Sequence, residues 1–400
     1  MKTFKCTCTG QPALFFENIS CLACERVTGF IDDFKLLQTF DVDSATGHFT
    51  QAEHPLKYYK KCHNYELHNA CNGMVEVNVN EAASAEPIKS EKSTGKVEND
   101  VLCFACRFND VIPDLNVKGH LPLWKKVEVA KRRALYTLNA LPLPLKNLDQ
   151  DPETGLSFSF TTDRDVKDHF ATKIKDQPAV MTGHNCGHIT VNLSEADDVA
   201  RSVTRLAMGE RYRTLLGHFR HELGHYYFDQ LIANDPGKNE LCKQYFGDHE
   251  LSYKDALDKH YKNGAPKDWA EQFISEYASM HPWEDWAETW AHYMHIIDTL
   301  ETAKNYGMTL TENETAHCGS EVSGLNLPQH QENFIFQTSF HSIIDAWVSF
   351  SIMLNSLNRS MGLPDAYPFV LTQSVRNKLM FVHHAIHNEL DALVVEDAAE

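Results

Sequence analysis

The stretch that decides the predicted fold is His221-Glu222-Leu223-Gly224-His225. Because its two histidines are four residues apart, both imidazoles leave the same face of a helix and can bind one metal ion. Glu222 lies beside that face, within reach of a water molecule on the metal. Zinc lowers the pKa of such a water to about 7, so a carboxylate can take its proton as the water attacks a carbonyl carbon. The stretch therefore predicts a catalytic zinc site, but in a chain with 22 histidines it needs support from the surrounding sequence.

The flanking sequence places this stretch on a helix that follows a sheet. Apolar residues at helical spacing predict a helix from Tyr212 to Ile232. Gly224 costs about 1 kcal/mol of helix propensity, which indicates that another backbone or the metal site comes close at that position. Residues 156–161, 179–181 and 188–193 are rich in β-forming side chains and predict a sheet whose edge can hold an extended peptide. His218, one turn upstream, is expected to play a supporting role, because three ligands already suffice.

A second predicted helix supplies the acidic partner. From Glu284 to His292 the sequence places Glu284 and Glu288 on one helical face, bordered by the small residues Ala287 and Ala291, which allow another helix to come close. A catalytic zinc ion needs three protein ligands and one open position. Glu284 is the expected third ligand, and Glu288 is expected to orient a zinc-bound histidine. The spacing also permits the reverse order.

Eight of the 11 cysteines precede residue 110 and predict two closed tetrahedral zinc sites. The first set consists of Cys6, Cys8, Cys21 and Cys24. The second set consists of Cys62, Cys71, Cys103 and Cys106. The second requires that a polar stretch, about residues 81–100, loop out, and His63 or His68 could replace one of its thiols. Redox-active cysteine pairs are the alternative interpretation.

Composition narrows the classes of function. The formal net charge of −18 at pH 7 argues against nucleic-acid binding, which needs a basic surface. The N-terminus shows no apolar signal region, and no apolar run reaches the length of about 18 residues that could span a membrane. A cytoplasmic protein without a membrane partner is therefore expected. In that compartment thiols stay reduced, and clustered cysteines bind metal more often than they form disulfides.

Together these stretches resemble the gluzincin-like family of zinc-binding metallopeptidases that carry N-terminal zinc-ribbon segments. The resemblance is carried by residues 14–18, 21–24, 112–115, 217–227 and 278–292. It implies a gluzincin-like catalytic domain in which Glu284 is a zinc ligand. It also implies that Tyr277, upstream of Glu284, donates a hydrogen bond to the oxyanion that develops on the substrate. Packing is the alternative role for Tyr277.

The predicted fold class is α+β. A zinc-ribbon module, residues 1–110, precedes a zincin-like metallopeptidase domain, residues 111–400, that is mostly helical in its second half. One catalytic and two structural Zn²⁺ ions are expected, with Glu222 as general base and acid and a peptide or protein as substrate. Two alternatives remain open: a non-catalytic adaptor that recruits a protein partner through its ribbons, and a hydrolase of a non-peptide amide.

Overall fold

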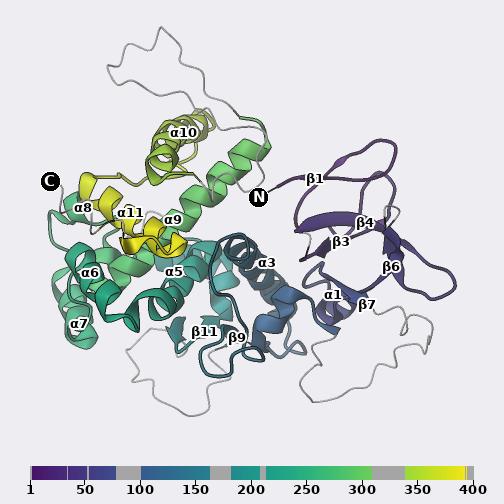
Figure 1. Ribbon diagram of the computed structural model, residues 1–400, viewed down its shortest axis with the longest axis horizontal. Coiled ribbons are helices and arrows are strands. Elements are labelled where there is room, and N and C mark those ends of the chain that lie inside the picture. Colours follow the sequence, from purple (N-terminus) through teal and green to yellow (C-terminus); the bar gives the residue numbers. More distant parts are fainter. Residues whose placement is uncertain are drawn as a thin grey trace, which may run out of the picture.

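The computed structural model describes residues 2–33, 35–51, 54–77, 101–162, 182–207, 213–308, 338–391 and 393. The polar stretch predicted at about residues 81–100 and the strand predicted at 179–181 lie outside these ranges. In Figure 1 the N-terminal strands gather at one end of the long axis and the C-terminal helices at the other.

The N-terminal part is built from antiparallel strands. A two-stranded sheet pairs β1 (Phe4–Lys5) with β2 (Ala13–Leu14). A five-stranded sheet then runs in sequence order through β3 (Val27–Ile31), β4 (Leu36–Val42), β5 (Phe49–Gln51), β6 (His54–Lys61) and β7 (Met74–Val77). An isolated bridge between Phe30 and Gly73 brings the end of this sheet back to its beginning, so the sheet curls. Helix α1 (His63–His68) and the 3₁₀ helix η2 (Phe104–Phe108) complete this part.

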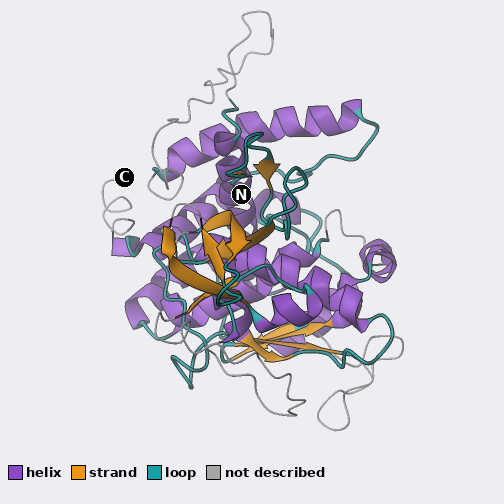
Figure 2. Ribbon diagram, turned by 90° about the vertical axis from the view of Figure 1, so that its right-hand side faces the viewer, coloured by secondary structure: helices purple, strands orange, loops and turns teal. Residues whose placement is uncertain are grey.

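A second, four-stranded sheet precedes the helical half, and Figure 2 shows the strands as separate groups. Its strands are β8 (Asn109–Val111), β9 (Ser157–Thr161), β10 (Gly183–Asn185) and β11 (His188–Asn192), in the order β10-β11-β9-β8. Strand β9 pairs in parallel with β8 and β11, whereas β10 is an antiparallel edge strand. The strands predicted at 156–161 and 188–193 are confirmed as β9 and β11. The predicted module boundary between residues 110 and 111 falls within β8.

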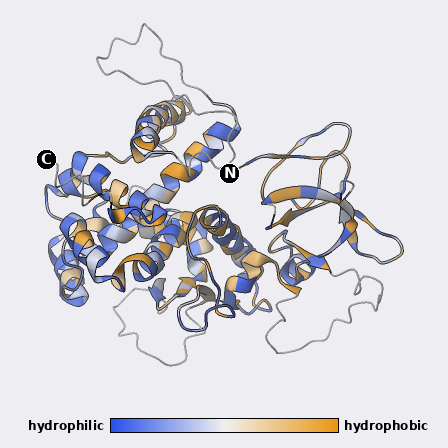
Figure 3. Cartoon of the chain, in the orientation of Figure 1, coloured by the Kyte–Doolittle hydropathy of each residue, from blue (hydrophilic) through white to orange (hydrophobic). Residues whose placement is uncertain are grey.

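Helices dominate the rest of the described chain, as predicted. They are α3 (His120–Leu138), η3 (Leu193–Ala196), α4 (Asp198–Ala207), α5 (Leu215–Phe228), η4 (Asp229–Ala233), α6 (Pro236–Phe246), α7 (Tyr253–Asn263), α8 (Trp269–Gln272), η5 (Tyr277–Met280), α9 (Pro282–Asn305), α10 (Phe340–Ser360) and α11 (Gln373–His387). Figure 3 shows hydrophilic and hydrophobic residues alternating along the outer helices, as expected of helices that bury one face. None of the described helices is both long and apolar enough to cross a lipid bilayer.

Helix α5 is shorter than predicted at both ends. It begins after Thr214, whose hydroxyl accepts a hydrogen bond from the backbone N–H of Gly217 at 3.0 Å. This N-cap satisfies a backbone donor that the first turn leaves free, so the helix starts at Leu215. At the other end the chain continues after Phe228 as one π-helical turn, η4, in which the predicted end, Ile232, lies.

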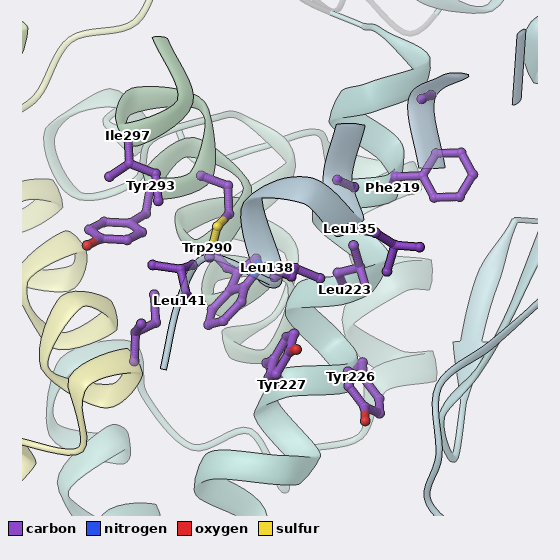
Figure 4. Packing of buried hydrophobic residues seen from close by; sticks show 14 of the residues in the cluster. Leu135, Leu138, Leu141, Phe219, Leu223, Tyr226, Tyr227, Trp290, Tyr293 and Ile297 are labelled. Carbon is purple, nitrogen blue, oxygen red and sulfur yellow. The ribbon is translucent and has the colours of Figure 1, made fainter. Parts of the chain in front are cut away.

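The core that positions the site is the contact between α5 and α9. Figure 4 shows Leu223 and Tyr227 of α5 packed with Trp290 and Tyr293 of α9, beside residues of α3. The rings of Tyr227 and Trp290 are stacked with their centroids 4.8 Å apart. A Cβ atom added to Gly224 would lie only 2.9 Å from the Cα of Ala287. The close approach predicted at Gly224 is thereby confirmed, and it is the backbone of α9 that comes close.

Candidate metal centre

The crossing of α5 and α9 brings the three predicted ligands of the catalytic metal together. Nε2 of His221 lies 2.9 Å from Oε2 of Glu284 and 3.2 Å from Nε2 of His225. Nε2 of His225 lies 3.5 Å from the same carboxylate oxygen. Ligand atoms 2.0–2.1 Å from a tetrahedral zinc ion are separated by about 3.3 Å. The three side chains therefore fit a zinc ion in both chemistry and spacing.

Glu288 occupies the outer side of the same centre. Its Oε1 lies 2.7 Å from Nδ1 of His221, and its Oε2 accepts a hydrogen bond from the hydroxyl of Ser275 at 2.6 Å. Burial favours a raised pKa for Glu288, but the hydrogen bond with His221 outweighs burial and lowers the pKa to about 2. An ionised carboxylate on Nδ1 directs the lone pair of Nε2 to the metal side. The geometry thus matches the order preferred from the sequence, with Glu284 on the metal side and Glu288 behind His221.

Glu222 and Tyr277 lie close to these ligands. The Glu222 side chain is buried, and no hydrogen bond or ion pair joins it to another residue of the described chain. The centroid of the Tyr277 ring lies 6.0 Å from that of the His221 ring. Burial raises the pKa of Tyr277 well above its usual value near 10, so the phenol keeps its proton.

His218 is paired elsewhere. Its Nδ1 lies 3.2 Å from Oε2 of Glu195, and Arg213 donates a hydrogen bond to the other oxygen of that carboxylate at 3.0 Å. Glu195 lies in η3, which directly follows strand β11. His218 thus ties the first turn of α5 to the sheet, which agrees with the supporting role expected for it.

The first cysteine set converges in the N-terminal part. The four Sγ atoms of Cys6, Cys8, Cys21 and Cys24 lie within 4.8 Å of one another. The Sγ atoms of Cys6 and Cys24 are 3.6 Å apart, close to the value of about 3.8 Å that Zn–S bonds of 2.3 Å require in a tetrahedron. All four are free thiols, so no disulfide competes with a metal.

The second set converges as well, and its four cysteines are buried. The Sγ atoms of Cys62, Cys71, Cys103 and Cys106 also lie within 4.8 Å of one another. Neither His63 nor His68 belongs to this group of ligand atoms, so four thiols complete it. Cys103 packs so tightly on Gly73 that a Cβ there would lie 2.4 Å from the Cβ of Cys103. This site joins the segment between β6 and β7, which contains Cys62 and Cys71, to η2.

Comparison with known families places the chain among zinc-binding proteins. Residues 120–385 match the family model described as "Putative zinc-binding metallo-peptidase", and residues 3–86 match a zinc-ribbon domain. This chain belongs to that metallopeptidase family. The resemblance found in the sequence is thereby confirmed, as is the N-terminal zinc ribbon.

Relatives of this metallopeptidase family member occur in mycobacteria. An uncharacterized protein of Mycobacterium bovis and uncharacterized proteins of two Mycobacterium tuberculosis strains are each 37% identical to it over 387 residues. The match covers 96% of this chain and 95% of each relative. No solved structure matches significantly.

One contact at this candidate metal centre was not predicted from the sequence. The hydroxyl of Tyr253, the first residue of α7, donates a hydrogen bond to Oε1 of Glu284 at 2.9 Å. Tyr253 lies 31 residues before Glu284, outside both predicted helices of the centre. Only its position at the start of an exposed, polar helix would have pointed to it, and that pattern alone does not indicate a contact with a ligand.

Proposed function

We propose that this chain is a zinc-dependent peptidase that hydrolyses peptide bonds at the centre formed by His221, His225 and Glu284. The observation that carries this proposal is the convergence of two imidazole nitrogens and one carboxylate oxygen at separations of 2.9–3.5 Å. Two histidines and one glutamate are the ligand set of a catalytic zinc ion, which keeps a fourth position open. A purely structural zinc site would instead have four protein ligands.

Each neighbouring residue then has a defined task. Zinc supplies Lewis-acid chemistry: it polarises the scissile carbonyl and makes water acidic enough to lose a proton near neutral pH. Glu222 accepts the proton of the attacking water and delivers it to the nitrogen of the leaving amine. Tyr277, whose phenol stays protonated because it is buried, donates a hydrogen bond to the oxyanion that develops on the carbonyl oxygen.

A peptide suits the surroundings of the centre. Strand β10 is an edge of the four-stranded sheet and contacts α5, the helix that carries His221 and His225. The N–H and C=O groups of an edge strand can pair with an extended peptide and so present a peptide bond to the metal. This arrangement of a sheet edge beside a metal-binding helix also supports the zincin-like assignment of the domain.

The two cysteine sets are proposed to hold one structural zinc ion each, giving three zinc ions per chain. Four thiolates close a tetrahedral site and leave no position for a substrate. Their task is to stabilise the N-terminal part, where a small curled sheet has little core of its own. A protein partner bound through the ribbons remains a prediction.

The decisive experiment is a digest of a peptide library, read by mass spectrometry, together with metal analysis of the same samples. The wild type is compared with Glu222→Gln and with Glu240→Gln, which changes an exposed glutamate of α6. We expect three zinc ions in all three proteins and at least a 100-fold loss of cleavage in Glu222→Gln alone. Three zinc ions without any peptide cleavage by the wild type would refute the peptidase and favour an adaptor. Cleavage restricted to non-peptide amides would favour the other alternative.

A further inference from the structure

The two oxygens of the Glu284 carboxylate have different partners. Oε2 faces Nε2 of His221 and Nε2 of His225, at 2.9 and 3.5 Å. Oε1 accepts the hydrogen bond from the hydroxyl of Tyr253 at 2.9 Å. The carboxylate is buried, with 2% of the residue exposed. One oxygen is therefore directed to the metal side, and the other is held by a phenol.

Tyr253 is held in place by the residue that caps α9. The backbone N–H of Trp283 donates to Nδ1 of His281 at 3.1 Å, so the proton of the neutral His281 ring resides on Nε2. That Nε2 then donates to the carbonyl oxygen of Leu251, two residues before Tyr253, at 3.1 Å. The rings of Tyr253 and His281 also pack edge to face, with centroids 5.4 Å apart. The start of α7 and the start of α9, which bears Glu284, are thus fixed to each other by one side chain.

Packing alone does not explain a tyrosine at this position. Helix α7 has no buried residue, and Tyr253 itself is 37% exposed. A phenylalanine would make the same ring contacts with His281 and Trp283. What only tyrosine provides is the hydroxyl that reaches the buried carboxylate. The structure therefore points to a task for that hydroxyl.

We propose that Tyr253 is a positioning residue that restricts Glu284 to binding the metal through one oxygen. This inference rests on the proposed function, because it assumes a metal ion at the centre. A carboxylate without the Tyr253 hydrogen bond can turn and offer both oxygens, which would occupy the open position that substrate and water need. Loss of a residue that holds a metal ligand typically lowers metal affinity 10–100-fold.

The test compares the wild type, Tyr253→Phe and the matched control Tyr261→Phe, an exposed tyrosine on the same helix. Zinc affinity is measured by competition with a chromogenic chelator. The centre is then loaded with Co²⁺, whose visible absorption weakens when its coordination number rises above four, while the ribbons contribute equally to all three proteins. For Tyr253→Phe we expect zinc affinity to fall by about 10–100-fold and the cobalt bands to weaken. Tyr261→Phe is expected to match the wild type in both measurements.

The outcomes separate this inference from the function on which it rests. If the wild type binds neither metal at the centre, both the proposed function and the role of Tyr253 fail. If the wild type binds metal and Tyr253→Phe has the same affinity and spectrum, only the role of Tyr253 is wrong. Thermal unfolding of the metal-free proteins tests whether Tyr253 serves only to pack and stabilise the fold. A metal-free Tyr253→Phe protein that loses as much stability as the metal-loaded one would also overturn the inference.

Discussion

Replacing Gly224 by alanine tests the contact that brings the two ligand-bearing helices together. The added Cβ would lie 2.9 Å from the Cα of Ala287, 3.1 Å from its carbonyl oxygen and 3.2 Å from the Cβ of Trp290. Carbon atoms in contact prefer about 3.5–4.0 Å, so α5 and α9 must separate by roughly 0.5 Å. Alanine gains about 1 kcal/mol of helix propensity over glycine, whereas overpacking of this kind costs about 1–3 kcal/mol. The two effects leave a net destabilisation of about 0–2 kcal/mol.

The shift also moves the metal ligands, because His225 follows Gly224 directly and Glu284 lies on α9 three residues before Ala287. We therefore expect weaker zinc binding at the catalytic centre even where the loss of stability is small. Denaturant unfolding and zinc competition are the assays. The control is Gly237→Ala in α6, where the nearest atom to the new Cβ is Oδ1 of Asp235 at an ordinary 3.4 Å. A Gly224→Ala protein with raised stability and unchanged zinc affinity would refute the close packing of α5 on α9.

Three further predictions concern the metals and the buried charge near the centre. Cys103→Ser is expected to remove one zinc ion per chain and to lower the unfolding temperature. The same change at the exposed Cys186 is expected to leave both unchanged. Metal analysis measures the zinc content, and calorimetry measures the unfolding temperature. Arg220→Met leaves the carboxylate of its buried partner Asp298 without its cation and is expected to cost about 3–5 kcal/mol in denaturant unfolding, part of which Asp298→Asn in the same chain restores. Dialysis against a chelator is expected to remove one zinc ion and the peptidase activity first, because thiolate sites with four ligands are closed. Added zinc is expected to restore both. Loss of all three ions together would contradict this order.

The candidate metal ligands could be predicted because few residue types bind zinc and their spacing is short. His221 and His225 are set by one helical turn, and the two cysteine sets could be assigned from pairs that are close in sequence. The tertiary arrangement adds only that Cys71 and Cys103 meet across the stretch between them. Local chemistry therefore carries most of the information about these centres.

The order of the two glutamates could not be settled from the sequence. Glu284 and Glu288 share one face of α9, so either can face a histidine. The way in which α9 crosses α5 decides which glutamate faces Nε2 of His221 and which faces Nδ1. Tyr253 was missed for the same reason, because its contact depends on how the start of α7 is held against His281. Contacts set by the packing of separate elements leave no periodic signal in a single sequence.

Helix ends were missed for a local reason. The predicted start of the metal-binding helix at Tyr212 followed the apolar pattern and gave no weight to Thr214, a good N-cap residue. Apolar periodicity locates a helix, but capping residues decide where it begins and ends.

The N-terminal part is joined to the metal centre through a short series of buried contacts. The ring of Tyr136, on α3, packs edge to face against that of Phe16, in the N-terminal part, with centroids 5.5 Å apart, and its hydroxyl donates to Glu301 of α9 at 3.3 Å. The next residue, Thr137, donates at 2.7 Å to Asp298, whose other oxygen pairs with Arg220, the neighbour of His221. A module that only recruits a partner would need no such contacts, since a flexible linker serves recruitment as well. The packing of Tyr136 instead makes the N-terminal part continuous with the buried contacts that join α3 to α9 and, through Asp298, to α5.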